Sequence, residues 1–212
     1  MPFKRWRRPA ALAIFLALAT GPAFSQSDNI LLDCTSCHSL SSEASPAYPV
    51  LNGQPVLYLI EQLDAYRTGN RAHQQMQRSA LALREGGAPA MARMYADAPA
   101  PELTLMGDRP EFETAMKLDA EGAWERGIPP CSSCHVSPTA ERTNIDPGAH
   151  ASPRIHGQSE AYLAGILRAY ASGERETGGL RRMQAYAERL TDEEIAALAS
   201  YLAAFKPVEQ NQ

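Results

Sequence analysis

Two short motifs in the sequence combine residue types that can bind a metal ion or a cofactor. Each has two cysteines separated by two residues, with a histidine directly after the second cysteine: CTSCH at 34–38 and CSSCH at 131–135. The six residues are Cys34, Cys37, His38, Cys131, Cys134 and His135. They include all four cysteines of the chain. Three chemistries use cysteines at this spacing: a redox dithiol, half of a zinc site, and covalent attachment of haem.

The surrounding sequence favours haem over the other two chemistries. A thioredoxin-like dithiol follows a strand in a mixed α/β fold, and no alternating strand pattern of any length is present. A zinc site would need the two cysteine pairs to meet in space, and it gives no reason for a histidine behind each pair. CxxCH is typical of c-type haem attachment, because cysteines on one helical turn can bond both vinyl groups while the histidine lies under the iron. We therefore predict two covalent haem c groups, with His38 and His135 as iron ligands.

An internal duplication surrounds both motifs. Residues 53–71, GQPVLYLIEQLDAYRTGNR, match residues 157–175, GQSEAYLAGILRAYASGER, at nine of nineteen positions. The two CxxCH motifs lie 97 residues apart, and the two matched segments lie 104 residues apart. We therefore expect two similar halves that each hold one haem.

Helices are expected to position the motifs. Apolar residues recur at helical spacing in both matched segments, and Gly69 and Gly173 lie where those helices should end. The last helix should begin with a capping box formed by Thr191 and Glu194. Its expected buried stripe is Ile195, Leu198, Leu202 and Phe205. The corresponding helix of the first half should be shorter and start near Pro89, because glycines replace the acidic cap residues there.

Each iron should take a sixth ligand from its own half. After residue 25 the methionines are Met76, Met91, Met94, Met106, Met116 and Met183. Only Met76 and Met183 occupy matching places, each seven residues before a leucine and ahead of the last helix of its half. We predict these two as axial ligands and interpret Met91 and Met94, at helical spacing, as core residues. The competing ligands are His73, His150 and His156, which we otherwise expect at the surface or facing the haem propionates.

The N-terminus has the pattern of a cleavable export signal. Four basic residues precede the apolar run AALAIFLALA at 10–19, and small residues follow it. A retained anchor is the alternative, but ten helical residues rise only about 15 Å, half of a hydrocarbon core of about 30 Å. Cleavage after residue 25 removes four basic residues and takes the formal charge from −4 to −8. This charge excludes nucleic acid as a partner and leaves only peripheral or partner-mediated membrane contact.

The chain resembles class I dihaem cytochromes c and is most similar to the cytochrome c4 family. The family's P-x-L-x-G-Q segment, S/T-G-x-R helix end and axial methionine read here as PVLNGQ, TGNR and Met76 in the first half. In the second half they read as PRIHGQ, SGER and Met183, and the final helix reads LTDEEIAALASY. The resemblance covers nearly all of 30–206. Ser39 and Val136 depart from it, because the family usually has glycine after CxxCH.

The resemblance implies an all-α fold of two tandem class I cytochrome c-type domains. Each domain would wrap around one covalent haem, and a pseudo-two-fold axis would relate the two. The expected division is a signal peptide at 1–25, an N-terminal domain at 26–98, a linker at 99–116, a C-terminal domain at 117–207 and a tail at 208–212. The carbonyls of Pro49 and Pro153 would accept hydrogen bonds from the ring nitrogens of His38 and His135.

The predicted function is electron transfer without catalysis. If both irons have six ligands, no position is open for a substrate. The resemblance implies a periplasmic carrier that passes electrons from a quinol-oxidising complex or a dehydrogenase toward a terminal oxidase. The alternative is a dihaem subunit of a dehydrogenase, for example one that oxidises sulfide or an alcohol. A dihaem peroxidase would need an open haem, and a thiosulfate-oxidising cytochrome with a cysteine ligand would need a fifth cysteine, which the chain lacks.

Overall fold

The computed structural model describes most of the chain from the first CxxCH motif onward. The described residues are 34–38, 45, 48–83, 85–107, 109–135, 152–177 and 181–208. The predicted signal at 1–25 lies outside them, as do Ser39, Val136 and His150.

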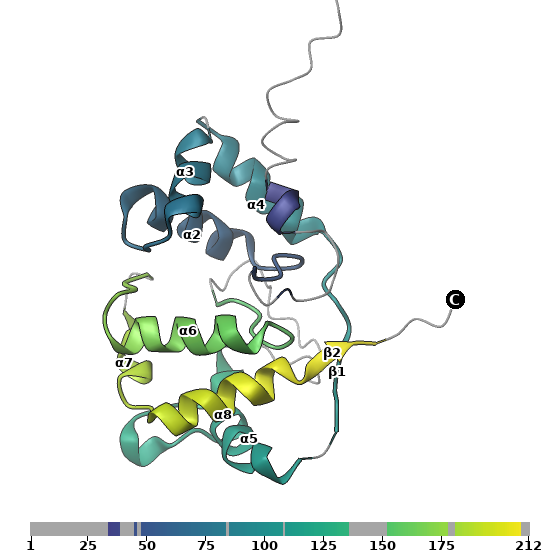
Figure 1. Ribbon diagram of the computed structural model, residues 1–212, viewed down its shortest axis with the longest axis vertical. Coiled ribbons are helices and arrows are strands. Elements are labelled where there is room, and N and C mark those ends of the chain that lie inside the picture. Colours follow the sequence, from purple (N-terminus) through teal and green to yellow (C-terminus); the bar gives the residue numbers. More distant parts are fainter. Residues whose placement is uncertain are drawn as a thin grey trace, which may run out of the picture.

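The described chain is mostly helical and folds into two groups of helices (Figure 1). The first group holds α2 (Val56–Thr68), α3 (Gln74–Ala82) and α4 (Gly87–Asp97). The second holds α5 (Glu113–Ala120), α6 (Glu160–Ala171), α7 (Arg182–Ala187) and α8 (Asp192–Ala203). Short 3-10 turns at Pro110–Phe112, Trp124–Arg126 and Cys131–Ser133 precede α6. No described helix is both long enough and apolar enough to cross a bilayer.

The helices follow the sequence duplication. The helices expected in the two matched segments are present as α2 and α6. Gly69 ends α2 in the left-handed conformation at φ 85°. Gly173, also left-handed at φ 77°, lies one residue beyond the last helical cap of α6. A left-handed residue at this place suits glycine, because a Cβ would clash with the following carbonyl. The matching glycine is therefore left-handed in both halves, although α6 ends one residue earlier in the repeat than α2.

The last helix of each half matches its prediction in part. The capping box of Thr191 and Glu194 is present at the start of α8. Its counterpart α4 starts at Gly87, two residues before Pro89, and it is shorter than α8 as expected, but only by one residue, eleven against twelve. Pro89 is tolerated as the third helical residue because the first N–H groups of a helix have no intrahelical acceptor.

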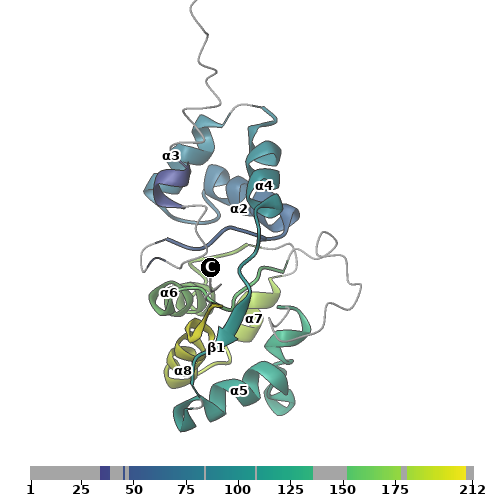
Figure 2. The ribbon, with the colours of Figure 1, turned by 90° about the vertical axis from the view of Figure 1, so that its right-hand side faces the viewer.

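Two short strands join the linker to the C-terminus. β1 (Leu103–Leu105) pairs antiparallel with β2 (Phe205–Pro207), and Figure 2 shows the chain passing from α4 through β1 toward α5. The sequence reasoning missed both strands, which are too short to show an alternating pattern. Phe205 is buried as expected, but it lies in β2 and not in the last helix. Residues 113–116 of the predicted linker already belong to α5.

Among the described residues, each half has its own hydrophobic cluster, and the two clusters differ in their number of residues. The first centres on Leu59, Ala92 and Tyr95, with Met94 packed against it. The second is larger and is formed by α5, α6, α8 and β2. Its buried members are Phe112, Ala115, Leu118, Ala123, Ile128, Leu163, Leu198, Ala199, Tyr201, Leu202, Ala203 and Phe205. A large apolar cofactor would therefore add most to the core of the first half.

Candidate functional site

Each CxxCH motif forms a single helical turn. Residues 34–37 are helical, and the His38 N–H donates to the Cys34 carbonyl at 2.8 Å. The second motif forms the 3-10 turn Cys131–Ser133, and the His135 N–H donates to the Cys131 carbonyl at the same distance. The four motif cysteines form no disulfide with one another, and none is fully buried. Among the described residues, no group of three or more His, Cys, Asp or Glu side chains could hold a metal ion.

The two motif histidines are oriented by the predicted proline carbonyls. His38 Nδ1 lies 3.0 Å from the Pro49 oxygen, and His135 Nδ1 lies 2.7 Å from the Pro153 oxygen. A carbonyl oxygen can only accept, so Nδ1 carries the proton and Nε2 keeps its lone pair for a metal. Burial lowers the pKa of both histidines, which also favours the neutral ring. Each motif therefore presents two thiols that can form thioether bonds to a haem and one histidine nitrogen that can ligate its iron.

The two candidate methionines occupy matching places at the start of matching helices. Met76 is the third residue of α3 and Met183 is the second residue of α7, and both are half-buried. α3 packs against α2, and α7 packs against α6. The unmatched Met106 and Met116 are exposed.

The described competing histidines are engaged elsewhere. His73 caps α3, where its Nδ1 accepts a hydrogen bond from the Met76 N–H at 3.2 Å. His156 does not lie at the surface, which was one of the two places we expected for it, because its side chain is buried. Its Nε2 lies 3.4 Å from Asp119 Oδ2, and its ring packs edge-on against Phe205. A partner carboxylate and an aromatic neighbour account for its burial.

Two buried arginines meet where the halves touch. Arg71 and Arg175 are 7% and 3% exposed, and they are matching residues of the duplication. Both guanidinium groups donate to Gln62 Oε1, at 2.9 Å and 2.7 Å. Arg71 also donates to the Tyr162 hydroxyl at 3.2 Å, and Arg175 reaches the Tyr58 hydroxyl at 3.5 Å. Each arginine therefore contacts the opposite half.

The arginine pair has no carboxylate partner among the described residues, whose ion pairs all involve other side chains. Each guanidinium lies 4.6 Å from the ring centroid of a tyrosine of its own half, Tyr66 or Tyr170. Burial alone would raise the pKa of Tyr58, yet the two arginines together lower it. Buried cations need a counter-charge. The cluster therefore fits anionic groups, and two haem propionates supply that chemistry.

Two glutamines also cross between the halves. Gln54 and Gln158 are both buried, and each bonds the backbone of the other half next to its motif-orienting proline. Sequence reasoning did not single out these glutamines or the arginines as functional. The available signal was their identity within the duplicated segments, since all four are among the nine repeated positions.

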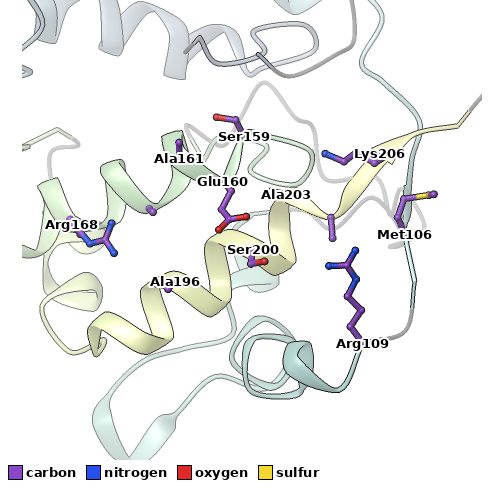
Figure 3. Close-up of a pocket in the computed structure, with 12 residues that line it drawn as sticks. Met106, Arg109, Ser159, Glu160, Ala161, Arg168, Ala196, Ser200, Ala203 and Lys206 are labelled. Carbon is purple, nitrogen blue, oxygen red and sulfur yellow. The ribbon is translucent and has the colours of Figure 1, made fainter. Parts of the chain in front are cut away.

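A separate surface groove of about 690 Å³ lies between α6 and α8 (Figure 3). Small side chains such as Ala161 and Ser200 line it together with the basic residues Arg109, Arg168 and Lys206. Its lining includes no cysteine or histidine. The groove therefore does not belong to either CxxCH motif.

Comparison with known proteins agrees with this geometry. A family model described as cytochrome c matches residues 130–206. The thiosulfate dehydrogenase electron acceptor of Stutzerimonas stutzeri is 33% identical over 173 residues, which are 80% of this chain and 77% of that protein. Cytochrome c4 of Thiocapsa roseopersicina is 31% identical over 176 residues, 80% of this chain and 85% of that one. The crystal structure of reduced cytochrome c4 from Pseudomonas stutzeri shares the fold, with a TM-score of 0.71, 24% identity and coverage of 85% and 97%.

Two helical halves, each with a CxxCH turn and an oriented histidine, define a dihaem c-type cytochrome of all-α fold. The chain belongs to the cytochrome c4 family. It carries two covalently bound haem c groups and is an electron-transfer protein of cytochrome c4 type. The thiols and histidines of the two motifs fit these groups, as does the uncompensated arginine pair.

Proposed function

We propose that the protein is an exported electron carrier whose two irons each have one histidine and one methionine ligand. Thioether bonds from Cys34 and Cys37 would hold the first haem, and bonds from Cys131 and Cys134 would hold the second. The proposed axial pairs are His38 with Met76 and His135 with Met183. The observation that carries the proposal is the hydrogen bond from each motif histidine to a proline carbonyl, which leaves Nε2 available in both halves. The matching places of Met76 and Met183 support methionine as the second ligand of each iron.

The bound haems supply one-electron exchange between ferric and ferrous iron. The protein's own residues hold the ligands still during that exchange. The proline carbonyls fix the histidine rings, and the capped starts of α3 and α6 support the helices that carry or pack against the methionines. With both axial positions filled by the protein, no small molecule would bind iron, so the proposed role is transfer and not catalysis. The arginine pair would hold anionic propionates at the contact between the halves.

We propose a dehydrogenase that oxidises a sulfur anion such as thiosulfate as the electron donor. The first relative above is named as the electron acceptor of a thiosulfate dehydrogenase, and the chain spans most of its length. A quinol-oxidising complex is the competing donor, and it is favoured by the likeness to cytochrome c4. The acceptor on the other side would be a terminal oxidase. The export pattern at 1–25 supports a periplasmic location for this exchange.

The first experiment measures haem content and location. The protein is expressed with its own N-terminus in a bacterium that has working haem-attachment machinery. The periplasmic fraction should yield a chain beginning near Gln26, with the mass of two haems that resist acid–acetone extraction. The bare polypeptide mass would contradict covalent attachment, and an intact N-terminus in the membrane fraction would favour the retained anchor.

The second experiment distinguishes the donors. The oxidised protein is mixed with a purified thiosulfate dehydrogenase and thiosulfate, or with a purified quinol-oxidising complex and quinol, and haem reduction is followed by stopped-flow absorbance. We expect faster reduction by the dehydrogenase, and no turnover of thiosulfate by the protein alone. Faster reduction by the quinol-oxidising complex would contradict the proposed donor. Catalytic consumption of thiosulfate by the protein alone would contradict the carrier role.

A further inference from the structure

Two buried glutamines form matching bridges between the halves. The side chain of Gln158 binds both backbone groups of Val50: its Oε1 accepts from the Val50 N–H at 2.9 Å, and its Nε2 donates to the Val50 carbonyl at 2.8 Å. Gln54 binds Arg154 in the same way, with both distances at 2.9 Å. The two glutamines are 4% and 5% exposed, so these bonds are shielded from water.

The bridges follow the duplication. Gln54 and Gln158 are 104 residues apart, as are Val50 and Arg154. Each glutamine lies two residues before the first residue of a helix, α2 or α6, and these helices lie on either side of the contact between the halves (Figure 1). The same residue type therefore performs the same task in both directions. An amide that only filled space would not need two correctly oriented hydrogen bonds in each half.

Each bridge ends on the peptide group that orients a motif histidine. The Val50 N–H and the Pro49 carbonyl belong to one peptide unit, and that carbonyl accepts from His38 Nδ1 at 3.0 Å. In the other half, the Arg154 N–H and the Pro153 carbonyl form the unit that orients His135. A hydrogen-bonded chain thus runs from each histidine, through one peptide, to a glutamine of the opposite half.

We propose, on the basis of the axial histidines proposed above, that each glutamine is a positioning residue for the haem of the other half. Gln158 positions His38, and Gln54 positions His135. An acceptor on the N–H of a peptide polarises that peptide and makes its carbonyl a stronger acceptor. The hydrogen bond from the histidine Nδ1–H to that carbonyl is then stronger, and the ring becomes a stronger electron donor to ferric iron. The glutamine therefore lowers the reduction potential of the haem across the contact.

The decisive test compares Gln158→Met with Gln54→Met. Methionine keeps the length and volume of the side chain but removes the strong acceptor and the donor. The reduction potential of each haem is measured by spectroelectrochemical titration. To tell which haem has shifted, the haem signals in nuclear magnetic resonance spectra are assigned through contacts with residues of their own half. In Gln158→Met, we expect the ferrous-to-ferric ratio of the N-terminal haem to rise about threefold at the parent's midpoint, or about 30 mV at 59 mV per tenfold change. In Gln54→Met, the C-terminal haem should shift instead.

The expected pattern, in which each variant shifts only the haem of the opposite half, distinguishes a positioning role from a role in holding the two halves together. If the glutamines only hold the halves together, the two variants should shift the same haem, or both haems equally, or neither, and each of these results would overturn the proposal. Amide hydrogen exchange provides a second readout, since Val50 should lose protection in Gln158→Met while Arg154 keeps it. Loss of protection at both amides in one variant would indicate general loosening of the contact.

A further variant covers the case in which methionine prevents folding. In Gln158→Glu, either carboxyl form keeps an oxygen acceptor for the Val50 N–H, so the potential of the N-terminal haem should stay at or below the parent value. A rise in that variant would contradict the proposal. Failure of the axial assignment is distinguishable, because it would appear in the parent protein as a missing haem or an altered ligand spectrum. Failure of the glutamine proposal would leave the parent intact and would appear only in the variants.

Discussion

The arginine cluster at the contact between the halves allows one prediction to be developed quantitatively. Gln62 Oε1 accepts from Arg71 at 2.9 Å and from Arg175 at 2.7 Å, so the two donor nitrogens are at most 5.6 Å apart. Two unit charges at that distance repel by about 3 kcal/mol at an effective dielectric constant of about 20. The shared glutamine oxygen holds the two like charges together, and Gln62→Leu removes it.

Hydrogen bonds to charged groups contribute about 1.5–3 kcal/mol each. Gln62→Leu removes two of them, but Tyr58, Tyr162 and the proposed propionates would retain part of the compensation. We therefore expect the free energy of unfolding of the haem-containing protein to fall by about 3 kcal/mol. The measurement is urea unfolding followed by far-ultraviolet circular dichroism, because urea leaves the ionic strength unchanged.

A matched control is Gln184→Leu. Gln184 also accepts from an arginine, since Arg181 Nε donates to its Oε1 at 2.8 Å, but that pair is exposed. The control should cost about 0.5 kcal/mol or less. Equal small losses in both variants would refute the reasoning, because the buried guanidinium groups would then not depend on the shared acceptor.

Gln62→Glu tests the counter-charge directly. If propionates already compensate the arginines, an added carboxylate changes stability little and lowers both reduction potentials, because negative charge favours ferric iron. A stabilisation of several kcal/mol would mean that the guanidinium groups lacked an anion in the parent protein. The placement of propionates at this contact would then be wrong.

Three further predictions concern the ligands, the partners and the last helix. Met76→Ala and Met183→Ala should each remove about half of the sulfur–iron charge-transfer absorption and create rapid binding of carbon monoxide, which the parent should lack; an unchanged band would contradict the ligand assignment. The rate of reduction by the partner should fall as salt rises, because the chain after the proposed cleavage would carry a formal charge of −8 and dock on basic surfaces, so a flat salt profile would count against this. The hydrogen bond from Arg126 lowers the pKa of Glu194, so the stability contributed by this pair is present above pH 4.5 and is lost as the pH falls through the lowered folded-state pKa. Acid titration of unfolding should show that loss in the parent and a smaller loss in Arg126→Ala, where Glu194 still accepts from the Thr191 N–H.

The locally encoded parts of the structure could be predicted from the sequence. Each CxxCH motif is a single turn, and the carbonyls of Pro49 and Pro153 lie where the resemblance placed them. The capping box at Thr191 needs only a residue three positions away, so a four-residue pattern predicts it. In each of these cases the interacting groups are close in the chain or belong to a recurrent family motif.

The parts that depend on distant contacts could not be predicted. β1 and β2 have three residues each and pair across about a hundred residues of chain, so neither shows a period of its own. His156 is buried because Asp119 and Phe205 approach it from other elements. The bridges of Gln54 and Gln158 exist only because the halves dock with matching faces together. Periodicity and spacing report on one segment at a time, and they contain no information on this docking.

The duplication also limits where the two haems can differ. Contacts made by repeated residues, such as the glutamine bridges, occur in both directions and treat both haems alike. Differences must come from positions where the halves diverge. Gln62 corresponds to Ile166, so one half alone supplies the oxygen shared by both arginines. The ionisable pair of His156 and Asp119 lies on the side of the second motif, where the first half has Asn52 in the place of the histidine. A difference in potential between the two haems should therefore originate at these unmatched polar residues, while the matched residues hold both histidines in one geometry.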